Sequence, residues 1–299
     1  MNRRELGRTG IQVSVLGYGA AALGGVYGQV SGREARRVVR CAVDRGINYF
    51  DTAPAYGDGL SEIRLGKALA GRRREIVLAS KAGRFQAGGR WEFDFSAARL
   101  RRSLEESLAR LNTDYLDVFQ LHDVEYADFN RILDEALPEL QAMKREGTIR
   151  AVGVTGRPTE LLARLAEQAR PDMILSYGHY TLLNTAIMER LAPVCASLEI
   201  GLVNAAPLEM RLLAPGGPPA WHPASPEIQE AIRRAREFCA GRGTSLEAVA
   251  VQFALANPAV ASTLVGMRTV KEIKRNISAL GIQPDPSLLA ELTGIVRMI

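Results

Sequence analysis

FSAARLRRSLEESLARLNTDYLDVFQLH, the stretch from Phe95 to His122, predicts an amphipathic helix followed by a short strand. In its first part leucines recur at spacings of three and four, at positions 100, 104, 108 and 111, which is the pattern of a helix with one buried face. Ser96 or Asp94 can cap the start of this helix with a side-chain oxygen. The apolar run Leu116–Leu121 then has the length of a strand.

The same helix-and-strand unit repeats along most of the chain. From about residue 13 to residue 280, short apolar or β-branched runs alternate with amphipathic stretches, which predicts a parallel sheet. The strand candidates are Val15–Gly19, Tyr49–Thr52, Ile76–Ser80, Leu116–Leu121, Ala151–Thr155, Met173–Tyr177, Leu202–Ala205 and Thr263–Gly266. The helix candidates are Arg33–Asp44, Leu60–Leu69, Phe95–Leu111, Ile132–Arg145, Thr159–Gln168, Thr185–Ser197, Pro226–Ala240 and Val270–Leu280. Eight strands that are each followed by a helix predict a closed (β/α)8 TIM barrel, formed by residues 1–299 as a single domain.

An open, doubly wound sheet is the alternative arrangement. Its usual signature is G-x-G-x-x-G after the first strand, and residues 17–22 (GYGAAA) depart from that pattern only at the last position. The acidic residue that binds the ribose, expected about 20 positions further on, is missing, because Asp51 belongs to a different motif. The barrel is therefore the favoured fold.

Three segments fall outside the repeating unit. Arg4–Val13, with the turn residues Thr9 and Gly10, predicts a hairpin that closes the N-terminal mouth of the barrel. Residues 207–226 contain six prolines and predict a loop at the C-terminal end of a strand, where binding loops lie. Asp285–Ile299 predicts a short amphipathic helix, a tail that covers the barrel or meets another subunit.

Composition and charge are those of a globular protein with a large core. Of the 299 residues 47% are hydrophobic and 24% are charged, which argues against disorder. The formal charge of +5 could indicate an anionic partner, but the arginines are scattered along predicted helices among glutamates. The one dense run, Arg72–Arg74, has no interleaved aromatic residues, so nucleic acid is not an expected partner.

Localisation is predicted from two further features. The three cysteines, at positions 41, 195 and 239, are odd in number and lack C-x-x-C spacing, which predicts free thiols in a reducing compartment. Met1–Gly10 lacks the apolar core of a signal peptide, and no apolar run approaches the roughly 20 residues of a membrane span. We therefore expect a cytoplasmic protein without a membrane partner.

Polar residues follow three successive predicted strands. Asp51 ends the second strand, with Tyr56 shortly after it, while Lys81 ends the third and His122 follows the fourth. Taken singly, each has an ordinary structural explanation, such as a turn cap, a packed ring, a surface lysine or a core histidine. Because side chains at the C-terminal ends of barrel strands converge, the four together predict a catalytic site.

These four residue types complement one another chemically. The hydroxyl of Tyr56 can act as a general acid or base if the ammonium of Lys81 lowers its pKa from about 10. Asp51 would pair with Lys81 and orient it. A neutral His122 would bind the substrate oxygen, so that a hydride can move between substrate carbon and a nicotinamide.

The motifs that carry these residues resemble the catalytic tetrad of the aldo-keto reductases, and the resemblance covers essentially the whole chain. They are Asp51–Tyr56 (DTAPAY), Ser80–Lys81 and Leu121–His122. Four further stretches are similar to the L-galactose dehydrogenase branch of that family, which oxidises an aldose at C1 to a lactone with NAD: Gln120–Glu125, Ile174–Tyr180, Gly217–Pro226 and Leu264–Met267. The resemblance implies that Tyr56 is the acid/base, that Asp51 and Lys81 tune it, that His122 orients the substrate, and that no metal is needed.

The resemblance also implies which residues bind the cofactor. With Asp51, these are Gly19 and Ala20 near the nicotinamide, Thr155, Gly156 and Ser176 near its carboxamide, Pro207 and Leu208 along the pyrophosphate, and Gly266, Met267, Arg268 and Asn276 around the adenosine. Thr155-Gly156 replaces the Ser-Asn of many members, and Ala205 stands where many have a tyrosine against the nicotinamide. Thr155 and Ser176 could instead simply fill the barrel.

Cofactor choice depends on whether arginines can bind a ribose 2′-phosphate. Cationic side chains are available at positions 268, 271, 274 and 275, but the charge of Glu272 would repel a phosphate. This favours NAD over NADP. Trp221 is a candidate for substrate binding, as a wall with His222 against a sugar's apolar face, although it could equally anchor its loop.

The predicted function is oxidation of an aldose of the L-galactose, L-fucose or D-arabinose type at C1, with NAD(P) as the acceptor and an aldonolactone as the product. One alternative is an NADPH-dependent reductase of small aldehydes or ketones such as pyridoxal. Another is a nucleotide-sensing binding subunit, against which the intact set of Asp51, Tyr56, Lys81 and His122 argues.

Overall fold

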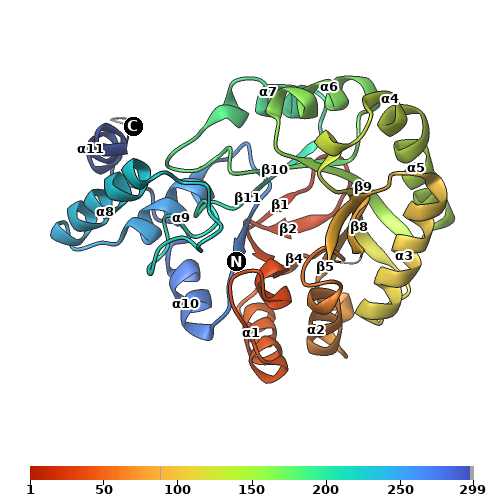
Figure 1. Cartoon of the computed structure of the whole chain (residues 1–299), viewed down its shortest axis with the longest axis horizontal. Helices are drawn as coiled ribbons and strands as arrows, with labels where there is room; N and C mark the ends of the chain where they lie inside the picture. Colours follow the sequence, from red (N-terminus) through yellow and green to blue (C-terminus); the bar gives the residue numbers. More distant parts are fainter. Residues whose placement is uncertain (88, 297–299) are drawn as a thin grey trace.

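A computed structural model describes residues 1–87 and 89–296 of the chain, and its centre is a closed barrel of eight parallel strands (Figure 1). In barrel order the strands are β3 (Leu16–Gly19), β4 (Tyr49–Asp51), β5 (Val77–Ala82), β8 (Leu116–Leu121), β9 (Ile149–Gly156), β10 (Met173–Tyr177), β11 (Gly201–Ala205) and β12 (Ser262–Gly266), which pairs with β3. All eight predicted strands and the barrel itself are confirmed.

Successive side chains of each strand point alternately into and out of the barrel, and this creates two apolar cores. Side chains such as Val118 and Val203 point into the barrel and form an interior cluster. Their neighbours, such as Phe119 and Leu202, point outward and pack against the helices in a larger cluster. Because the sheet is buried on both faces, the strands are nearly continuous apolar runs.

The helices lie outside the barrel, most of them against its strands and the C-terminal ones to one side of it (Figure 1). They are α1 (Gly32–Asp44), α2 (Leu60–Leu69), α3 (Ala97–Leu111), the short α4 (Phe129–Arg131), α5 (Leu137–Glu146), α6 (Thr159–Ala169), α7 (Leu191–Ser197), α8 (Pro226–Gly241), α9 (Leu246–Ala256), α10 (Val270–Ser278) and α11 (Pro286–Val296). Ser96 caps α3, as predicted, because its Oγ accepts the backbone N–H of Arg99.

Two predicted helices differ in detail from the structure, and two further elements were not predicted. Thr185–Ser197 is a 3₁₀ turn (Ala186–Met188) followed by α7, and Ile132–Arg145 begins with a π turn (Ile132–Ala136) before α5. Pro138 lies in the first turn of α5 and lacks the N–H that a regular helix would use there. The sequence analysis missed α9 and a hairpin formed by β6 (Arg84–Ala87) and β7 (Arg90–Phe93).

The N-terminal hairpin closes the barrel from below, as predicted. It consists of β1 (Arg3–Glu5) and β2 (Gln12–Ser14). Leu6, Ile11 and Val13 are buried and belong to the same cluster as the inward-facing strand residues. The bottom of the barrel is therefore covered, and the opposite, C-terminal mouth is the end available for a site.

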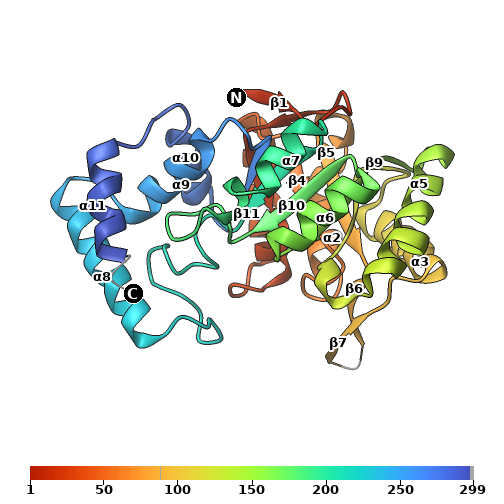
Figure 2. The same ribbon diagram turned by 90° about the horizontal axis from the view of Figure 1, so that it is seen from above.

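The C-terminal part extends the molecule to one side of the barrel. In two views at right angles, α11 lies beside α8, away from the strands (Figures 1 and 2). Leu288 and Leu292 of α11 pack with Ile232 of α8 and with residues of α9 in a third apolar cluster. The predicted tail helix, Asp285–Ile299, is present over Pro286–Val296 and packs against α8 rather than the barrel; residues 297–299 lie outside the described residues.

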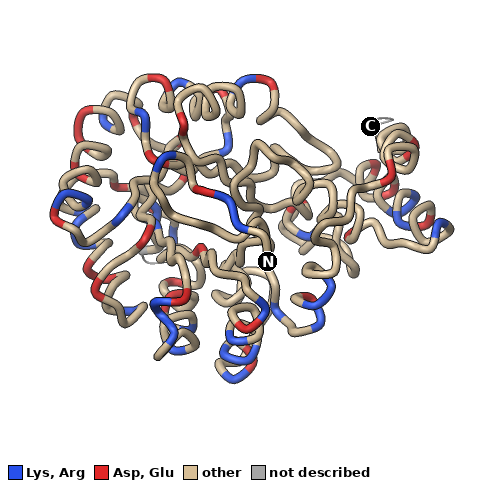
Figure 3. The backbone as a smooth tube through the Cα atoms, turned by 180° about the vertical axis from the view of Figure 1, so that it is seen from behind, with Lys and Arg blue, Asp and Glu red and all other residues tan. Residues whose placement is uncertain are grey.

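Charges of both signs alternate along the outer helices (Figure 3). Residues 41, 195 and 239 are free cysteines, as expected. Within residues 1–87 and 89–296, none of the helices has both the length and the apolar character that crossing a membrane requires.

Candidate active site

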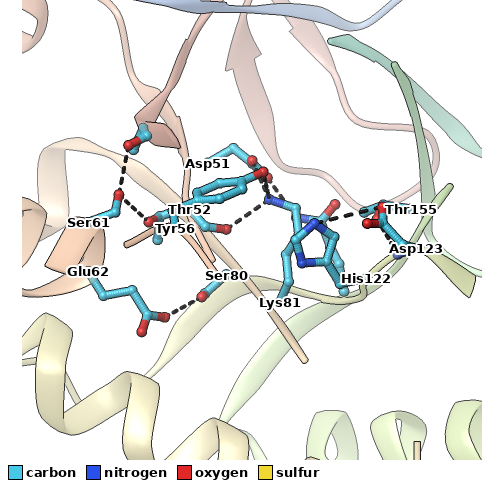
Figure 4. A network of polar contacts seen from close by, with 12 residues as sticks. Asp51, Thr52, Tyr56, Ser61, Glu62, Ser80, Lys81, His122, Asp123 and Thr155 are labelled. Atoms are coloured by element: carbon cyan, nitrogen blue, oxygen red, sulfur yellow. Dashed lines mark hydrogen bonds and ion pairs between the residues drawn. The ribbon is translucent and has the colours of Figure 1, made fainter. Parts of the chain in front are cut away.

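The structure brings Asp51, Tyr56, Lys81 and His122 together at the C-terminal mouth of the barrel (Figure 4). Asp51 ends β4, Lys81 lies in β5, and His122 follows β8 directly. Tyr56 lies in the turn between β4 and α2. Its hydroxyl is 3.4 Å from Nζ of Lys81, and its ring meets the ring of His122 edge-on at a centroid distance of 5.8 Å.

Lys81 and Asp51 form a buried ion pair. Lys81 is 1% exposed and Asp51 3% exposed. Nζ of Lys81 donates to Asp51 and also to the carbonyl oxygen of Thr52 at 2.8 Å, while Nε2 of Gln120 donates to the other oxygen of Asp51 at 2.8 Å. These contacts hold the ammonium group directly beside the phenol.

The effect on Tyr56 is opposite to the one expected. Burial, and then the carboxylates of Asp51 and Asp123, raise the pKa of Tyr56 well above its usual value, while Arg84 acts weakly in the other direction. The physical reason is that Asp51 compensates the charge of Lys81, so the cost of burying a phenolate dominates. The expectation that Lys81 lowers this pKa is therefore wrong as a net effect, and the phenol is protonated at neutral pH.

His122 is neutral at physiological pH. Burial, aided by the positive charges of Lys81 and Arg84, lowers the pKa of His122 to about 3, although the carboxylate of Asp123 opposes the shift. Its Nε2 lies 3.8 Å from Oδ1 of Asp123, and its Nδ1 has no hydrogen-bond partner among the described residues. Because Nε2 is too far from Oδ1 for a hydrogen bond, a neutral imidazole can use Nε2 to bind a substrate oxygen.

Backbone contacts position the turn that carries Tyr56. A Cβ on Gly24 would lie 2.4 Å from the carbonyl oxygen of Tyr56, so only glycine allows the two segments to approach this closely. Ser61, at the start of α2, donates to the carbonyl of Ala20 at 2.7 Å and contacts Oγ1 of Thr52 at 2.8 Å (Figure 4). The turn is thus tied to β3 and β4.

A second set of contacts fixes the strand that carries Lys81 to the helices outside the barrel. Ser80, its neighbour in β5, points outward and donates to Glu62 of α2 at 2.5 Å (Figure 4). Glu62 is fully buried, and its other oxygen accepts from Arg110 of α3 at 2.6 Å. The strand that carries Lys81 is therefore locked to two helices.

A cavity is lined by several of the residues predicted to bind the cofactor. Its lining includes four predicted cofactor residues and two others that the sequence analysis missed: Pro207, Leu208, Gly266, Arg268, Tyr27 and Arg211. The backbone at Gly266 is exposed, and a Cβ there would meet only the carbonyl of Gly19, at 3.8 Å. Asn276 is 2% exposed, and its Oδ1 has no hydrogen-bond partner among residues 1–87 and 89–296; buried polar groups of this kind normally have one.

Gly19 and Ala20 lie at the inner end of this region. Gly19 is the strand neighbour of both Asp51 and Gly266. Backbone at Gly19 therefore lies between the catalytic group and the cavity, which suits a nicotinamide ring placed against it. Ala20 is buried, and its carbonyl is already occupied by Ser61.

Other predicted cofactor residues have structural partners. Thr155 is buried and its Oγ1 accepts the N–H of Asp123 at 3.1 Å, while Ser176 is buried 3.5 Å from Nδ1 of His179. Gly156 is buried, and a Cβ there would meet Glu125 at 2.8 Å. The side chain of Met267 lies in the core, and its carbonyl accepts from the hydroxyl of Tyr18.

Trp221 lies on the rim, in the proline-rich loop. It is 54% exposed, and its ring centroid is 6.1 Å from that of Tyr27, a residue of the cavity wall. His222 anchors the loop, since its Nε2 contacts the carbonyl of Glu209 at 3.0 Å and its Nδ1 accepts from Ala224 at 3.1 Å. Anchoring by His222 therefore leaves the indole available to a ligand.

The missed β6–β7 hairpin brings further residues to the mouth. Arg84 of β6 forms an ion pair with Asp123, and its guanidinium lies 4.2 Å from the centroid of the Trp91 ring. A glycine pair at positions 88–89, between two stretches in which polar and apolar residues alternate (84–87 and 90–93), is a hairpin signal that could have located this element. Among residues 1–87 and 89–296, no group of three or more His, Cys, Asp or Glu side chains could hold a metal ion.

Comparisons with known proteins show which family this chain resembles. Residues 15–297 match the model of the aldo/keto reductase family. The chain is 40% identical to an L-galactose dehydrogenase of Arabidopsis thaliana, over 99% of this chain and 94% of that protein, and 33% identical to a D-threo-aldose 1-dehydrogenase of a Pseudomonas species, over 95% and 94%. Among solved structures, an aldo-keto reductase of Bacillus halodurans in its holo form superposes with a TM-score of 0.83 at 29% identity, covering 100% of this chain and 96% of the other.

Proposed function

Because the chain belongs to the aldo/keto reductase family of NAD(P)-dependent oxidoreductases, we propose that it oxidises a cyclic aldose at C1 to the aldonolactone. The reacting groups at the mouth support hydride transfer, and the similarity to two aldose dehydrogenases supports the substrate class. L-Galactose, L-fucose and D-arabinose are the first candidates.

Each residue of the site has a part in this reaction. When bound, NAD supplies an oxidised nicotinamide ring, which accepts the hydride from C1 and adds a positive charge to the site. Tyr56, as phenolate, takes the proton of the anomeric hydroxyl, and the C1–O1 bond becomes the carbonyl of the lactone. Lys81, 3.4 Å from the phenol oxygen, stabilises the phenolate, and neutral His122 donates a hydrogen bond to O1.

The proposal is tested by following the formation of reduced cofactor on a panel of free aldoses and identifying the product. Lactone formation by the wild-type protein, and its loss by a factor of about 10³ or more in Tyr56→Phe, is the expected result. Binding of cofactor to the variant, measured by fluorescence, should remain nearly unchanged. Turnover only of aldehydes with NADPH would favour the reductase alternative, and cofactor binding with no turnover would favour a nucleotide-sensing role.

NAD is the preferred cofactor in this proposal. Glu272 and Glu247 both line the cavity, and one oxygen of Glu247 is buried with no hydrogen-bond partner in the part of the chain that the structure describes. Carboxylates can accept hydrogen bonds from ribose hydroxyls, whereas they repel a 2′-phosphate.

Glu272→Gln tests this preference. Glu272 also belongs to the capping box of α10, with Thr269, and glutamine can keep that capping role without the charge. We expect the ratio of kcat/KM for NADP to that for NAD to rise about fivefold, with unchanged thermal stability. An unchanged ratio would remove Glu272 from cofactor selection.

A further inference from the structure

One carboxylate oxygen beside the reacting groups has no partner. Asp123 follows His122 at the end of β8 and is 1% exposed. Its Oδ2 pairs with Arg84, and the phenol of Tyr177 lies near the carboxylate, but among the described residues no donor makes a well-formed hydrogen bond to its Oδ1. Because a buried acceptor is costly to leave unsatisfied, this oxygen is a candidate for binding a ligand.

The orientation of Asp123 is held by several contacts. Its backbone has a left-handed φ of 56°, and its N–H donates to Oγ1 of Thr155 at 3.1 Å (Figure 4). The guanidinium that pairs with Oδ2 is itself stacked over Trp91. The side chain is therefore fixed, with Oδ1 3.8 Å from Nε2 of His122.

Other polar atoms at this edge of the mouth are also unsatisfied within the described residues. They are Nδ1 of His122, Nε of Arg84 and Oε2 of Glu125. The set includes both donors and acceptors. A ligand with several hydroxyl groups can satisfy both, since each hydroxyl donates one hydrogen bond and accepts others. A simple aldehyde has no donor for the carboxylate.

We propose that Oδ1 of Asp123 accepts a hydrogen bond from the hydroxyl on C2, the carbon next to the reacting C1, and thereby restricts the substrate to sugars with a free 2-hydroxyl. This rests on the proposed oxidation at C1. His122 binds O1 in that reaction, and oxygens on adjacent carbons can reach two groups as close together as its Nε2 and Oδ1 of Asp123. Arg84 is a positioning residue that holds the carboxylate in this orientation.

The test compares the aldose that the wild-type protein oxidises fastest with its 2-deoxy counterpart. We expect kcat/KM for the 2-deoxy sugar to be about 100-fold lower in the wild type, because a buried carboxylate is then left unpaired. Asp123→Asn, which is nearly isosteric, should lower kcat/KM about tenfold for the parent sugar and much less for the 2-deoxy sugar. Asp134→Asn, which neutralises an exposed carboxyl outside this set of atoms, should leave the ratio between the two sugars unchanged.

Arg84 variants separate positioning from general stability. Arg84→Lys keeps a cation beside Asp123 and should retain most of the discrimination between the two sugars. Arg84→Met should lose it, although both variants unfold at similar temperatures. A merely structural role of Arg84 would leave the discrimination intact in both.

Two results would overturn the inference: equal oxidation of both sugars by the wild-type protein, or an equal loss for both sugars in Asp123→Asn. The first needs no variant, so it remains decisive even if a substitution prevents folding. If the wild-type protein oxidises no aldose at all, the proposed function itself fails, and this inference fails with it.

Discussion

At the scale of single residues, burying the charged and polar side chains at the mouth of the barrel opposes folding. Lys81 and Asp51 are almost completely buried, and the desolvation of two charges offsets much of their attraction. Within the part of the chain that the structure describes, the network leaves polar atoms of Gln120, His122 and Asp123 without hydrogen-bond partners. Such costs concentrate where a protein binds ligands and performs chemistry.

The raised pKa of Tyr56 predicts an alkaline activity profile for oxidation. The phenolate takes the proton, and burial keeps the phenol protonated at neutral pH. The kcat/KM for aldose oxidation should therefore rise up to about tenfold per pH unit between about pH 6 and pH 9. Initial rates in buffers of constant ionic strength measure this.

Lys81→Met is the matched variant for the pH profile. Without the ammonium, the phenolate loses a stabilising charge, so activity should fall and its rise should extend to higher pH. A profile for the wild-type protein that is flat, or that declines above pH 7, would contradict the assignment of Tyr56 as the base.

His122 predicts a loss of stability in acid. Its pKa falls from 6.5 to about 3 in the folded protein, so between these values the unfolded chain binds a proton that the folded protein does not. Stability should therefore fall as the pH decreases through this window. Relative to His122→Gln, the wild-type protein should lose about 2 kcal/mol of unfolding free energy between pH 7 and pH 5, measured by urea denaturation. A constant difference between the two proteins would show that His122 is not buried as a neutral ring.

At the scale of elements, the regular pieces were predictable and the irregular ones were not. α3 follows its leucine spacing and its Ser96 cap. α9 was missed because its own residues are apolar on nearly every face of the helix. Without a polar face, the sequence shows no helical period of apolar and polar residues. The β6–β7 hairpin was missed because it lies outside the barrel repeat.

Gly83, between β5 and β6, should be irreplaceable for the hairpin. Its φ is 96°, and a Cβ there would lie 2.3 Å from the buried ring of Phe95. Gly83→Ala should lower the free energy of unfolding by about 2–5 kcal/mol, through backbone strain and overpacking. Gly147→Ala is the control, because Gly147 also has a positive φ but open space around it, and it should cost about 1 kcal/mol. Equal losses in chemical denaturation would contradict the role of Phe95.

At the scale of the whole molecule, stability and chemistry lie at opposite ends of the barrel. The N-terminal hairpin seals the bottom with Leu6, Ile11 and Val13, while Lys81 and His122 face the top. This division is general for such barrels, in which loops at the C-terminal ends of the strands carry the site.

Leu6→Ala tests this division. Leu6 is fully buried in the interior cluster, so its truncation should lower the free energy of unfolding by about 2–5 kcal/mol. At a temperature where the variant is folded, kcat/KM should stay within about twofold of the wild type. Arg3→Ala, an exposed change in the same hairpin, should alter stability by less than about 0.5 kcal/mol. A large loss of kcat/KM in folded Leu6→Ala would show that the bottom of the barrel and the site are energetically coupled.

The sequence by itself determined the barrel and the meeting of Asp51, Lys81 and His122, whereas the place of Tyr56, beyond the end of β4, depends on the packing of its turn against Gly24. Once eight strands run parallel and close, their C-terminal ends converge, so residues at those ends must meet whatever the loops do. Local periodicity was sufficient for that inference.

Only the tertiary structure decided the direction of the Tyr56 pKa and the partner of Asp123. The first depends on the balance between burial and a compensated ammonium, which no spacing encodes. The second joins Asp123 to Arg84, 39 residues away on a hairpin outside the repeat. Desolvation and contacts between distant loops arise only when the chain is folded. These two effects set the protonation state of Tyr56 and the orientation of Asp123.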